Sequence, residues 1–449
     1  MNISKHGWKV AVAGECMVCR TFSVHCEPEF IKIKEIMTKA DVCYGHLEMN
    51  FGEFSTACPA RGDTRGSYML ADPAVAKDLH WLGIDIMSLA HNHSFNFGAP
   101  IILDTIRYCR EAGMTCAGTG RDLEEAREPG YWEGETGRVA LVATSTGNDA
   151  YEWANLSKGS MPTRPGINPL RINMRYCIPA DDAKVLRRIG EKLGVLRLLK
   201  TTIPSAPEQS EFSLIMPTET HAKGSFCEGE DFSIESSCNP RDLEGNLRSI
   251  DEANKMADFV MVAHHFSVSE GPRGDTPPSF AREFAHAAID AGADVYFGHG
   301  WHKTLGIEIY HGRPIFYGLG NFFAQSQFIR RVPYDGYESW GLLDNNHVTG
   351  LRPSDKQPER SGLKHQFPWW NSAIIELEYT PDKEIKAISI HPVELGRDAS
   401  NEVPITRNNG RPFISSGQTA RRTLERFQTL SKPFGTEIMI KSDIGRWES

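Results

Sequence analysis

Strand-like and helix-like segments alternate along the first third of this chain and again beyond residue 240. Short apolar runs predict buried strands at residues 8–13, 42–44, 84–89, 114–117, 139–144, 259–263 and 295–297. Segments with a helical pattern lie between them, at residues 34–39, 72–83, 100–112, 123–128, 242–256 and 278–291. This alternation favours parallel β-α-β units with right-handed crossovers, because parallel strands need a long connection that a helix can supply. The chain is therefore predicted to be an α/β protein.

Two stretches break the alternation. Residues 147–240 are rich in Pro, Gly, Ser and Asn and contain one helical pattern, at residues 181–193. In a compact enzyme, a long irregular insertion usually forms part of the substrate site or a lid. Near the C-terminus we expect loop at residues 324–368, an antiparallel hairpin at residues 373–379 and 385–390, and a helix at residues 419–430.

Composition excludes several classes of protein. The chain has 449 residues and a formal net charge of -9, so it lacks the basic surface that nucleic-acid binding requires. Its first residues lack the apolar segment of a secretory signal, and no run approaches the ~18 apolar residues of a membrane span. We therefore expect a soluble, cytoplasmic protein without a membrane anchor. Cys16 and Cys19 form a CxxC motif, but no second CxxC completes a four-cysteine zinc site.

Side chains that can bind metal ions follow five of the predicted strands. They are Glu15, Glu48, the pair Asn92 and His93, His265, and the pair His299 and His302. Carboxylate, amide and imidazole groups are ligands for divalent cations such as Zn²⁺, Mn²⁺ or Fe²⁺. Since the carboxyl ends of parallel strands meet at one edge of a sheet, we expect these groups to converge on a divalent metal site. For the two histidines of the GHGWH motif alone, an ordinary surface loop is the alternative.

Two arginines lie on a proline-containing loop of the insertion, RPGINPLR. Arg164 and Arg171 could hold a carboxylate or phosphate of the substrate through paired hydrogen bonds. Alternatively, both side chains only fasten this loop to its own domain.

Seven blocks of sequence together resemble a known family. In order they read AGECMV, GHLEMNFGE, GIDIMSLAHNHSFNFG, AGTGRDLEEAREP, ADFVMVAHHF, AIDAGADVYFGHGWH and IEIYHGRPIFYGLGNFF. They resemble the CapA family of poly-γ-glutamate capsule biosynthesis proteins, a relative of the calcineurin-like metallophosphoesterases. The resemblance extends over residues 8–145 and 250–323. It implies a metallophosphatase-like αββα sandwich in which the irregular insertion helps to form the substrate site.

The resemblance also implies an organisation and roles for particular residues. Residues 1–449 would form one CapA-like domain, with residues 147–240 as an insertion or cap and residues 324–449 as a C-terminal extension of loop, hairpin and helix. The implied metal ligands are Glu48, Asn92, His265 and His302, with Glu15 and His299 as further candidates. In the mechanism that we expect from these residues, His93, next to a ligand, is the general acid, and Arg164 and Arg171 bind an anionic end of the substrate.

The chain departs from the family pattern at several positions. Glu15 stands where the family usually has Asp, His46 where it has Asn, and Trp301 where proline is common. The Asp-x-His pair of true calcineurin-like phosphatases is absent, which argues against a full two-metal centre. One or two ions are expected.

Taken together, these features predict a metal-dependent hydrolase that acts on an amide bond, γ-glutamyl-like, or on a phosphoester bond of a small anionic substrate. The alternative is a non-catalytic accessory protein that binds poly-γ-glutamate or its synthase. The expected partner is a small anionic substrate or a glutamyl polymer. The sequence is also compatible with a homo-oligomer.

Overall fold

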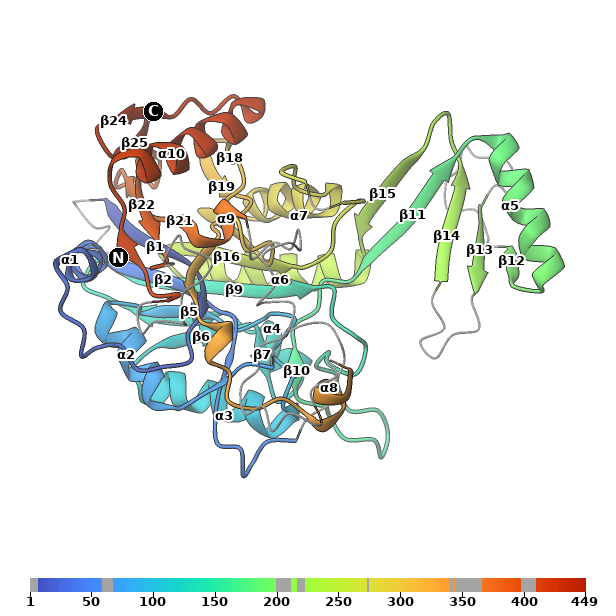
Figure 1. The fold of residues 1–449 in the computed structure, drawn as a ribbon, viewed down its shortest axis with the longest axis horizontal. Coiled ribbons are helices and arrows are strands. Elements are labelled where there is room, and N and C mark those ends of the chain that lie inside the picture. Colours follow the sequence, from blue (N-terminus) through green and yellow to red (C-terminus); the bar gives the residue numbers. More distant parts are fainter. Residues whose placement is uncertain are drawn as a thin grey trace.

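Two β-sheets packed face to face form the body of the protein, as seen in a computed structural model (Figure 1). The structure describes residues 7–58, 68–198, 211–215, 223–272, 274–339, 343, 366–396 and 409–449. Helices cover the outer face of each sheet, so the body has four layers. The α/β prediction is confirmed at this level.

The first sheet is a mixed sheet, with parallel and antiparallel strands. Its parallel strands are β1 (Trp8–Met17), β2 (Val42–Leu47), β5 (Ile86–Ser88), β6 (Thr115–Ala117) and β20 (Asn321–Ala324). Its antiparallel strands are β21 (Asn371–Tyr379), β22 (Ile385–Glu394), β23 (Phe413–Ile414), β24 (Met439–Lys441) and β25 (Ile444–Glu448). β1 pairs in parallel with β2 on one side, and on the other side pairs antiparallel with β21 and, nearer its carboxyl end, in parallel with β20. The outer face is covered by α1 (Pro28–Met37), α2 (Ala74–Leu82) and α3 (Gly98–Glu111).

The second sheet has a parallel centre and antiparallel edges. The parallel strands are β9 (Arg138–Thr146), β16 (Phe259–Phe266), β17 (Val295–His299) and β19 (Arg313–Phe316). The edges are β8 (Gly130–Glu133) and β18 (Ile307–Tyr310). Its outer face packs against α6 (Pro240–Met256) and α7 (Ser279–Asp290). Smaller elements of the body are β3 (Asn50–Phe51), β4 (Leu70–Ala71), β7 (Thr119–Gly120), α4 (Leu123–Arg127) and β10 (Gly166–Ile167).

Strict alternation of side chains along β16 builds two separate cores. Met261 and Ala263 face the space between the sheets, whereas Val260 and Val262 face α6 and α7. Because successive side chains of a strand point to opposite faces, the next residues, His264 and His265, are separated in the same way. His264 belongs to the outer core, and His265 faces the other sheet.

The predicted strands are divided between the two sheets, and three of the strand-end residues lie in the strands themselves. Our expectation of convergence at one edge of a single parallel sheet was therefore wrong in its geometry. β1 continues through Glu15, and β16 and β17 continue through His265 and His299. The sheets nevertheless place the carboxyl ends of their parallel strands together, so the donors come from both sides of one interface.

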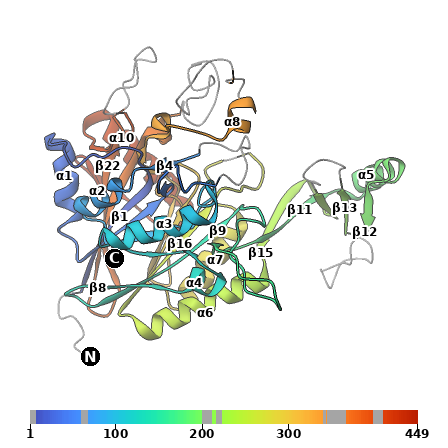
Figure 2. The ribbon, with the colours of Figure 1, turned by 90° about the horizontal axis from the view of Figure 1, so that it is seen from below.

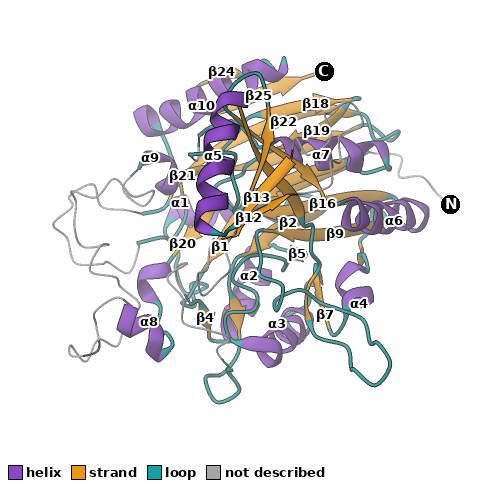
Figure 3. Cartoon of the chain, turned by 90° about the vertical axis from the view of Figure 1, so that its right-hand side faces the viewer, coloured by secondary structure: helices purple, strands orange, loops and turns teal. Residues whose placement is uncertain are grey.

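A small lobe projects from the body in two perpendicular views (Figures 1 and 2). It consists of β11 (Ile172–Ile178), α5 (Ala180–Leu193), β12 (Leu196–Leu198), β13 (Glu211–Ile215), β14 (Lys223–Glu228) and β15 (Ser233–Cys238). Figure 3 looks at the molecule from this side, with α5 in front of the strands. Ile178, Ala183 and Phe212 form its own small core. The sequence predicted α5 but missed this sheet, because its strands alternate between half-buried and exposed residues and contain few long apolar runs.

Two predictions for the C-terminal part are confirmed. The predicted hairpin is formed by β21 and β22, and the predicted helix is α10 (Gly417–Ser431). The stretch expected as loop also contains η1 (Ser326–Phe328), α8 (Tyr334–Ser339) and α9 (Phe367–Trp370). Within it, residues 340–342 and 344–365 lie outside the described residues. A further short helix, η5 (Lys432–Phe434), precedes β24 and β25, which were not predicted. Over the described ranges, we find no helix with the length and apolar character of a membrane span.

Candidate metal centre

A row of polar side chains crosses the first sheet near the carboxyl ends of its parallel strands. Glu15 of β1 is in register with Asn321 of β20 on one side and His46 of β2 on the other, and His46 is in register with Ser88 of β5. Residues in register on parallel strands lie side by side. Positions far apart in the sequence are therefore brought together by strand pairing.

A bulge in β1 turns the Glu15 side chain toward the other sheet. Val12 pairs with Tyr44, but Glu15 pairs with His46, so β1 contains one more residue than β2 over this interval. An extra residue reverses the alternation of side chains beyond it. Without the bulge, Glu15 would follow Ala13 toward the helices that cover the outer face.

The second sheet supplies the facing row. His265 of β16 is in register with His299 of β17 and with Ser145 of β9. The two rows meet at a hydrogen bond of 3.0 Å between Nδ1 of His265 and Nε2 of His46. The site therefore lies at the interface between the sheets.

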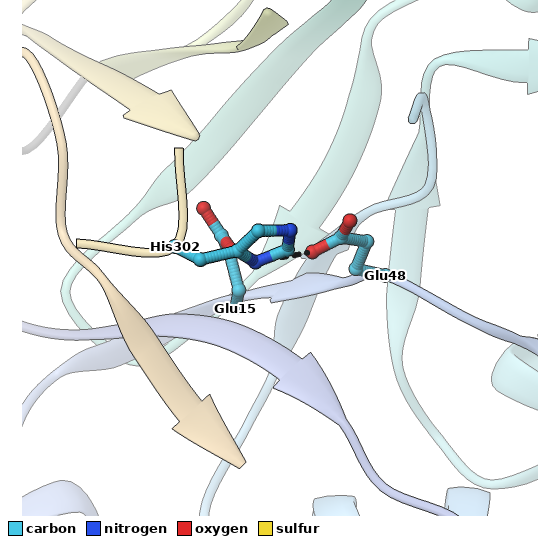
Figure 4. A group of neighbouring side chains, drawn as sticks. All are labelled: Glu15, Glu48 and His302. Atoms are coloured by element: carbon cyan, nitrogen blue, oxygen red, sulfur yellow. Dashed lines mark ion pairs between the residues drawn. The ribbon is translucent and has the colours of Figure 1, made fainter. Parts of the chain in front are cut away.

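Glu15, Glu48 and His302 form the closest cluster of ligand atoms at this interface. One ligand atom from each lies within 4.8 Å of the others, and Figure 4 shows the imidazole beside both carboxylates. Nδ1 of His302 is 2.5 Å from Oε2 of Glu15 and 3.5 Å from Oε2 of Glu48. Both carboxylates are buried, whereas the His302 side chain is 14% exposed. The cluster is thus open to solvent on the side of His302.

The same imidazole nitrogen also lies 3.0 Å from Oδ1 of Asn321. A ring nitrogen carries at most one proton, so it cannot donate to three oxygen atoms at once. A cation at this point would satisfy the oxygen atoms together, and buried charges are normally paired or bound to metal. The surroundings of His302 therefore fit a metal ion.

Two further buried atoms have no hydrogen-bond partner among the described residues. They are Oδ1 of Asn92 and Nε2 of His265. A buried polar atom without a hydrogen-bond partner costs about 1–3 kcal/mol in stability. A bound ligand at this point would remove that cost. Oxygen and imidazole nitrogen are the atoms that divalent Zn, Mn or Fe binds. The donor set is thus suited to a divalent metal ion.

Electrostatics set the charges of these groups. Burial acts to raise the pKa of Glu15, but the adjacent His302 imidazole, with its charge and hydrogen bond, outweighs this effect and lowers the pKa to about 2. Burial, together with the neighbouring imidazoles, holds the pKa of His265 well below its usual value. At neutral pH the centre therefore presents an ionised carboxylate and a neutral imidazole, which are the forms that bind metal.

Local backbone geometry fixes the loop that carries His302. Gly300 has φ 102°, and its N–H donates to Oε1 of Glu15 at 2.6 Å. A Cβ atom at Gly300 would lie 2.5 Å from the carbonyl oxygen of Phe266 and 3.1 Å from Nε2 of His265. His302 itself has φ 57°, an uncommon conformation for a residue with a side chain and one that is concentrated at functional sites.

His93 lies at the solvent side of the cluster. Its Nδ1 is 2.9 Å from Oδ1 of Asn96, and its Nε2 is 3.9 Å from Oε1 of Glu48. Since the amide oxygen can only accept, Nδ1 carries the proton in this bond and Nε2 is directed toward the centre. Nδ2 of Asn50 holds the main chain of His93 by donating to its carbonyl oxygen at 2.9 Å.

Like His265, the predicted ligand His299 lies in the same interface but is not a member of the cluster of Glu15, Glu48 and His302. Its Nε2 is 2.8 Å from the hydroxyl of Tyr44, and its ring stacks on His46 with centroids 4.2 Å apart. His264, by contrast, binds Thr146 and Tyr296 in the outer core.

The two arginines of the insertion are occupied within the protein. The Arg164 side chain donates hydrogen bonds to the carbonyl oxygens of Trp153 and Ala150. The Arg171 side chain forms a bidentate ion pair with Asp242. These contacts favour the alternative in which the side chains fasten the loop. Substrate binding by the arginines stays a prediction that the geometry disfavours.

Sequence reasoning did not identify Asn321, Tyr44 or Ser88 as parts of the site. Tyr44, His46 and Glu48 alternate along and just beyond β2, a period-two signal that places all three on one face. No comparable signal marks Asn321 or Ser88, because their importance depends on which strands pair.

Comparison with known proteins agrees with the resemblance of the motifs. The family model described as "Bacterial capsule synthesis protein PGA_cap" matches residues 9–326. An uncharacterized protein of Sinorhizobium fredii, y4sH, is 30% identical over 448 residues, which cover 98% of this chain and 92% of that protein.

Two relatives with more informative names match over shorter lengths. The PGA biosynthesis protein CapA of Bacillus subtilis is 44% identical over 84 residues, 18% of this chain and 21% of its own. A probable polyglutamine synthesis accessory protein of Mycobacterium tuberculosis is 25% identical over 291 residues, 63% of this chain and 56% of its own.

Proposed function

Because this chain belongs to the family of bacterial capsule synthesis proteins, PGA_cap, we propose that it is a metal-dependent hydrolase of a small anionic substrate. The bond is an amide, γ-glutamyl-like, or a phosphoester. One observation carries this proposal: ligand atoms of Glu15, Glu48 and His302 lie within 4.8 Å of one another in a buried site with an open side.

In this proposal Glu15, Glu48 and His302 hold the ion, and Asn92 and His265 complete its surroundings with their buried donor atoms. A divalent ion bound there would lower the pKa of a water molecule and polarise the scissile carbonyl or phosphoryl oxygen. The two carboxylates balance the charge of the ion, and the N–H of Gly300 keeps Glu15 in place. One or two ions are compatible with this set of donors.

His93 is the proposed general acid. Its hydrogen bond to Asn96 directs Nε2 toward the centre, where this nitrogen lies 3.9 Å from Oε1 of Glu48. The imidazolium would transfer its Nε2 proton to the leaving amine or alkoxide as the bond breaks. The neutral imidazole could then accept a proton from the next water molecule.

The insertion is the proposed source of substrate recognition. Asn148, at its start, donates to the carbonyl oxygen of His91 at 3.2 Å, which places this part of the insertion against the centre. We propose a single metallophosphatase-like αββα domain, with residues 147–240 as the insertion and residues 324–449 as an extension. β21 supports the latter assignment because it pairs directly with β1.

The second candidate is a non-catalytic accessory protein that binds poly-γ-glutamate or its synthase. The name of the Mycobacterium tuberculosis relative, a probable synthesis accessory protein, favours this alternative. Under it, the same carboxylates and imidazoles would hold a structural ion, and His93 would have no role in turnover.

Metal analysis and activity assays together distinguish the two. We expect the purified protein to contain a divalent metal by elemental analysis. We also expect it to hydrolyse p-nitrophenyl phosphate, bis-p-nitrophenyl phosphate or a γ-glutamyl amide when Mn²⁺ or Zn²⁺ is supplied. Metal without turnover on all three substrates, together with binding of poly-γ-glutamate, would favour the accessory role. Absence of both metal and turnover would remove the hydrolase proposal.

A further inference from the structure

A continuous hydrogen-bonded chain links His265 to His299 through the interior of the protein. Nδ1 of His265 is 3.0 Å from Nε2 of His46, and Nδ1 of His46 is 2.7 Å from Oγ of Ser88. Ser88 Oγ is 2.8 Å from the hydroxyl of Tyr44, which is 2.8 Å from Nε2 of His299. All five side chains are buried. These five linked side chains are therefore shielded from bulk solvent.

Both ends of this chain are nitrogen atoms without a partner. Nε2 of His265 and Nδ1 of His299 are buried and have no hydrogen bond among the described residues. The other ring nitrogen of His265 and of His299 is hydrogen-bonded within this series of side chains, and both ring nitrogens of His46 are.

Counting protons restricts what the two ends can do. A neutral imidazole or hydroxyl carries one exchangeable proton, so the five side chains carry five. Each of the four hydrogen bonds uses one proton, since a bond without a proton or with two would be repulsive. Burial makes charged side chains unfavourable, and it also makes N–H or O–H groups without an acceptor unfavourable. The five side chains are therefore neutral, and all four hydrogen bonds between them are formed. One proton remains, and it lies on His265 Nε2 or on His299 Nδ1.

It follows that the three histidines change tautomer together. If His265 Nε2 is bare, then His265, His46 and His299 all carry their protons on Nδ1. If His299 Nδ1 is bare, all three carry their protons on Nε2. A metal ion needs a bare nitrogen, so the neutral chain offers it one of the two ends at a time.

The position of the Glu15 and Glu48 carboxylates determines which of the two terminal nitrogen atoms binds the metal ion. Nε2 of His265 lies beside Gly300, 3.1 Å from the place of a Cβ atom there, and the N–H of Gly300 is bound to Glu15. His265 therefore has the better access to the cluster of Glu15, Glu48 and His302.

We propose that His46, Ser88 and Tyr44 act as a proton-sharing chain that makes His265 the metal-binding member of the pair and gives His299 a protonated Nδ1. His46 is then a positioning residue, which fixes the tautomer of His265. The assignment of the metal-binding end rests on the proposed metal centre, whereas the sharing of tautomers rests only on the hydrogen bonds.

The test is ¹⁵N NMR of histidine-labelled protein, with resonances assigned by single substitutions and measured without metal and with Zn²⁺. In metal-free protein, His46, His265 and His299 are expected to share one tautomer or one pair of tautomer populations. With Zn²⁺, all three should carry the proton on Nδ1. His264 is the internal control, because its partners are Thr146 and Tyr296 and its tautomer should not respond.

Two substitutions, with a third as control, test whether these side chains share protons or only support the fold. Ser88→Ala interrupts it, so Zn²⁺ should still set the tautomers of His265 and His46 but no longer that of His299. His46→Phe removes the hydrogen bond to His265 and should weaken Zn²⁺ binding about 10- to 100-fold, the usual effect of losing a partner of a metal-binding histidine. Tyr44→Phe should leave Zn²⁺ affinity within about 3-fold, since it lies beyond His46, and it controls for general loss of packing.

The outcomes distinguish this inference from the function itself. Mixed tautomers in metal-free wild type, such as Nδ1–H on His265 with Nε2–H on His299, would overturn the proton-sharing chain. Zn²⁺ that binds and drives all three histidines to Nε2–H would overturn the choice of His265. If no Zn²⁺ binds and the metal-free tautomers still agree, the chain stands and the proposed metal centre fails.

Discussion

Oε2 of Glu15 lies 2.5 Å from Nδ1 of His302, although Glu15 belongs to the first sheet and His302 follows a strand of the second. This contact joins the two sheets at the carboxyl ends of their parallel strands. Two oxygen atoms from other residues, Glu48 and Asn321, lie within 3.5 Å of the same nitrogen. A cation at this position would turn the contact between the sheets into a binding site.

Removing a donor atom from this cluster is expected to abolish metal uptake without unfolding the protein. His302→Ala and His265→Ala should each reduce metal affinity by more than about 100-fold, because loss of a ligand exceeds loss of a residue that supports one. His311→Ala is the matched control, since His311 is an exposed loop histidine. Metal content is measured by elemental analysis and folding by circular dichroism. Full occupancy in His265→Ala would show that the ligand assignment is wrong.

Substitution of His93 should separate turnover from metal binding. His93→Ala is expected to retain the metal and to slow hydrolysis by roughly 10²- to 10⁴-fold, the usual contribution of a general acid. Asn96→Ala should have a smaller effect, because it removes only the hydrogen bond that orients the ring. The measurement is kcat for whichever assay substrate is turned over. An unchanged rate in His93→Ala would remove this residue from the mechanism.

Gly300 is expected to be intolerant of any side chain. In Gly300→Ala the new Cβ would lie 2.5 Å from the carbonyl oxygen of Phe266, in addition to the cost of a positive φ. Gly159→Ala is the matched control, because Gly159 also has a positive φ but has no atom within 4 Å of the Cβ position. Chemical denaturation should show a loss of about 1–2 kcal/mol for the control and a clearly larger loss for Gly300→Ala. Equal losses would contradict the close approach.

The ion pair between Glu27 and Arg411 should make stability depend on pH in the acid range. The hydrogen bonds from Arg411, which is itself buried, lower the pKa of Glu27 from 4.5 to about 2. A lowered folded-state pKa stabilises the protein above the unfolded-state value, and this contribution is lost as pH falls from about 4.5 toward 2.

Glu27→Gln tests this ion pair. At pH 7 we expect a loss of about 1–2 kcal/mol, less than for a fully buried pair because the carboxylate is partly exposed. The difference from wild type in denaturant unfolding should shrink as the pH is lowered toward 2. A difference that stays constant between pH 7 and pH 3 would argue against the shifted pKa.

Two cysteines of the small lobe are placed to form a disulfide. Cys177 and Cys227 are in register on the neighbouring parallel strands β11 and β14, with their Sγ atoms 2.6 Å apart. Oxidised glutathione is expected to take two electrons from the pair and leave as two thiols, lowering the protein mass by two hydrogen atoms. Burial raises the pKa of Cys227 to about 12, so the reaction should be slow at pH 7 and faster at higher pH. Mass spectrometry follows it, and Cys177→Ser should prevent it.

The sequence by itself determined the α/β class, most strands and helices of the body, and the residue types of the candidate metal centre. The family resemblance singled out His265 among the neighbouring histidines, and in the structure alternation along β16 places His264 and His265 on opposite faces. These features are local: periodicity and the residues that end a strand or helix are contained within a short window of sequence.

Only the tertiary structure decided which strands share a sheet and which way Glu15 points. The bulge in β1 is visible only against β2, and Asn321 joins the site only because β20 pairs with β1. The sheet of the small lobe likewise depends on distant pairing, since β11 pairs with β14 and β15, in addition to the weak apolar pattern of its strands. Strand pairing depends on partners distant in sequence, so local patterns place the donor atoms near strand ends but do not say which of them meet.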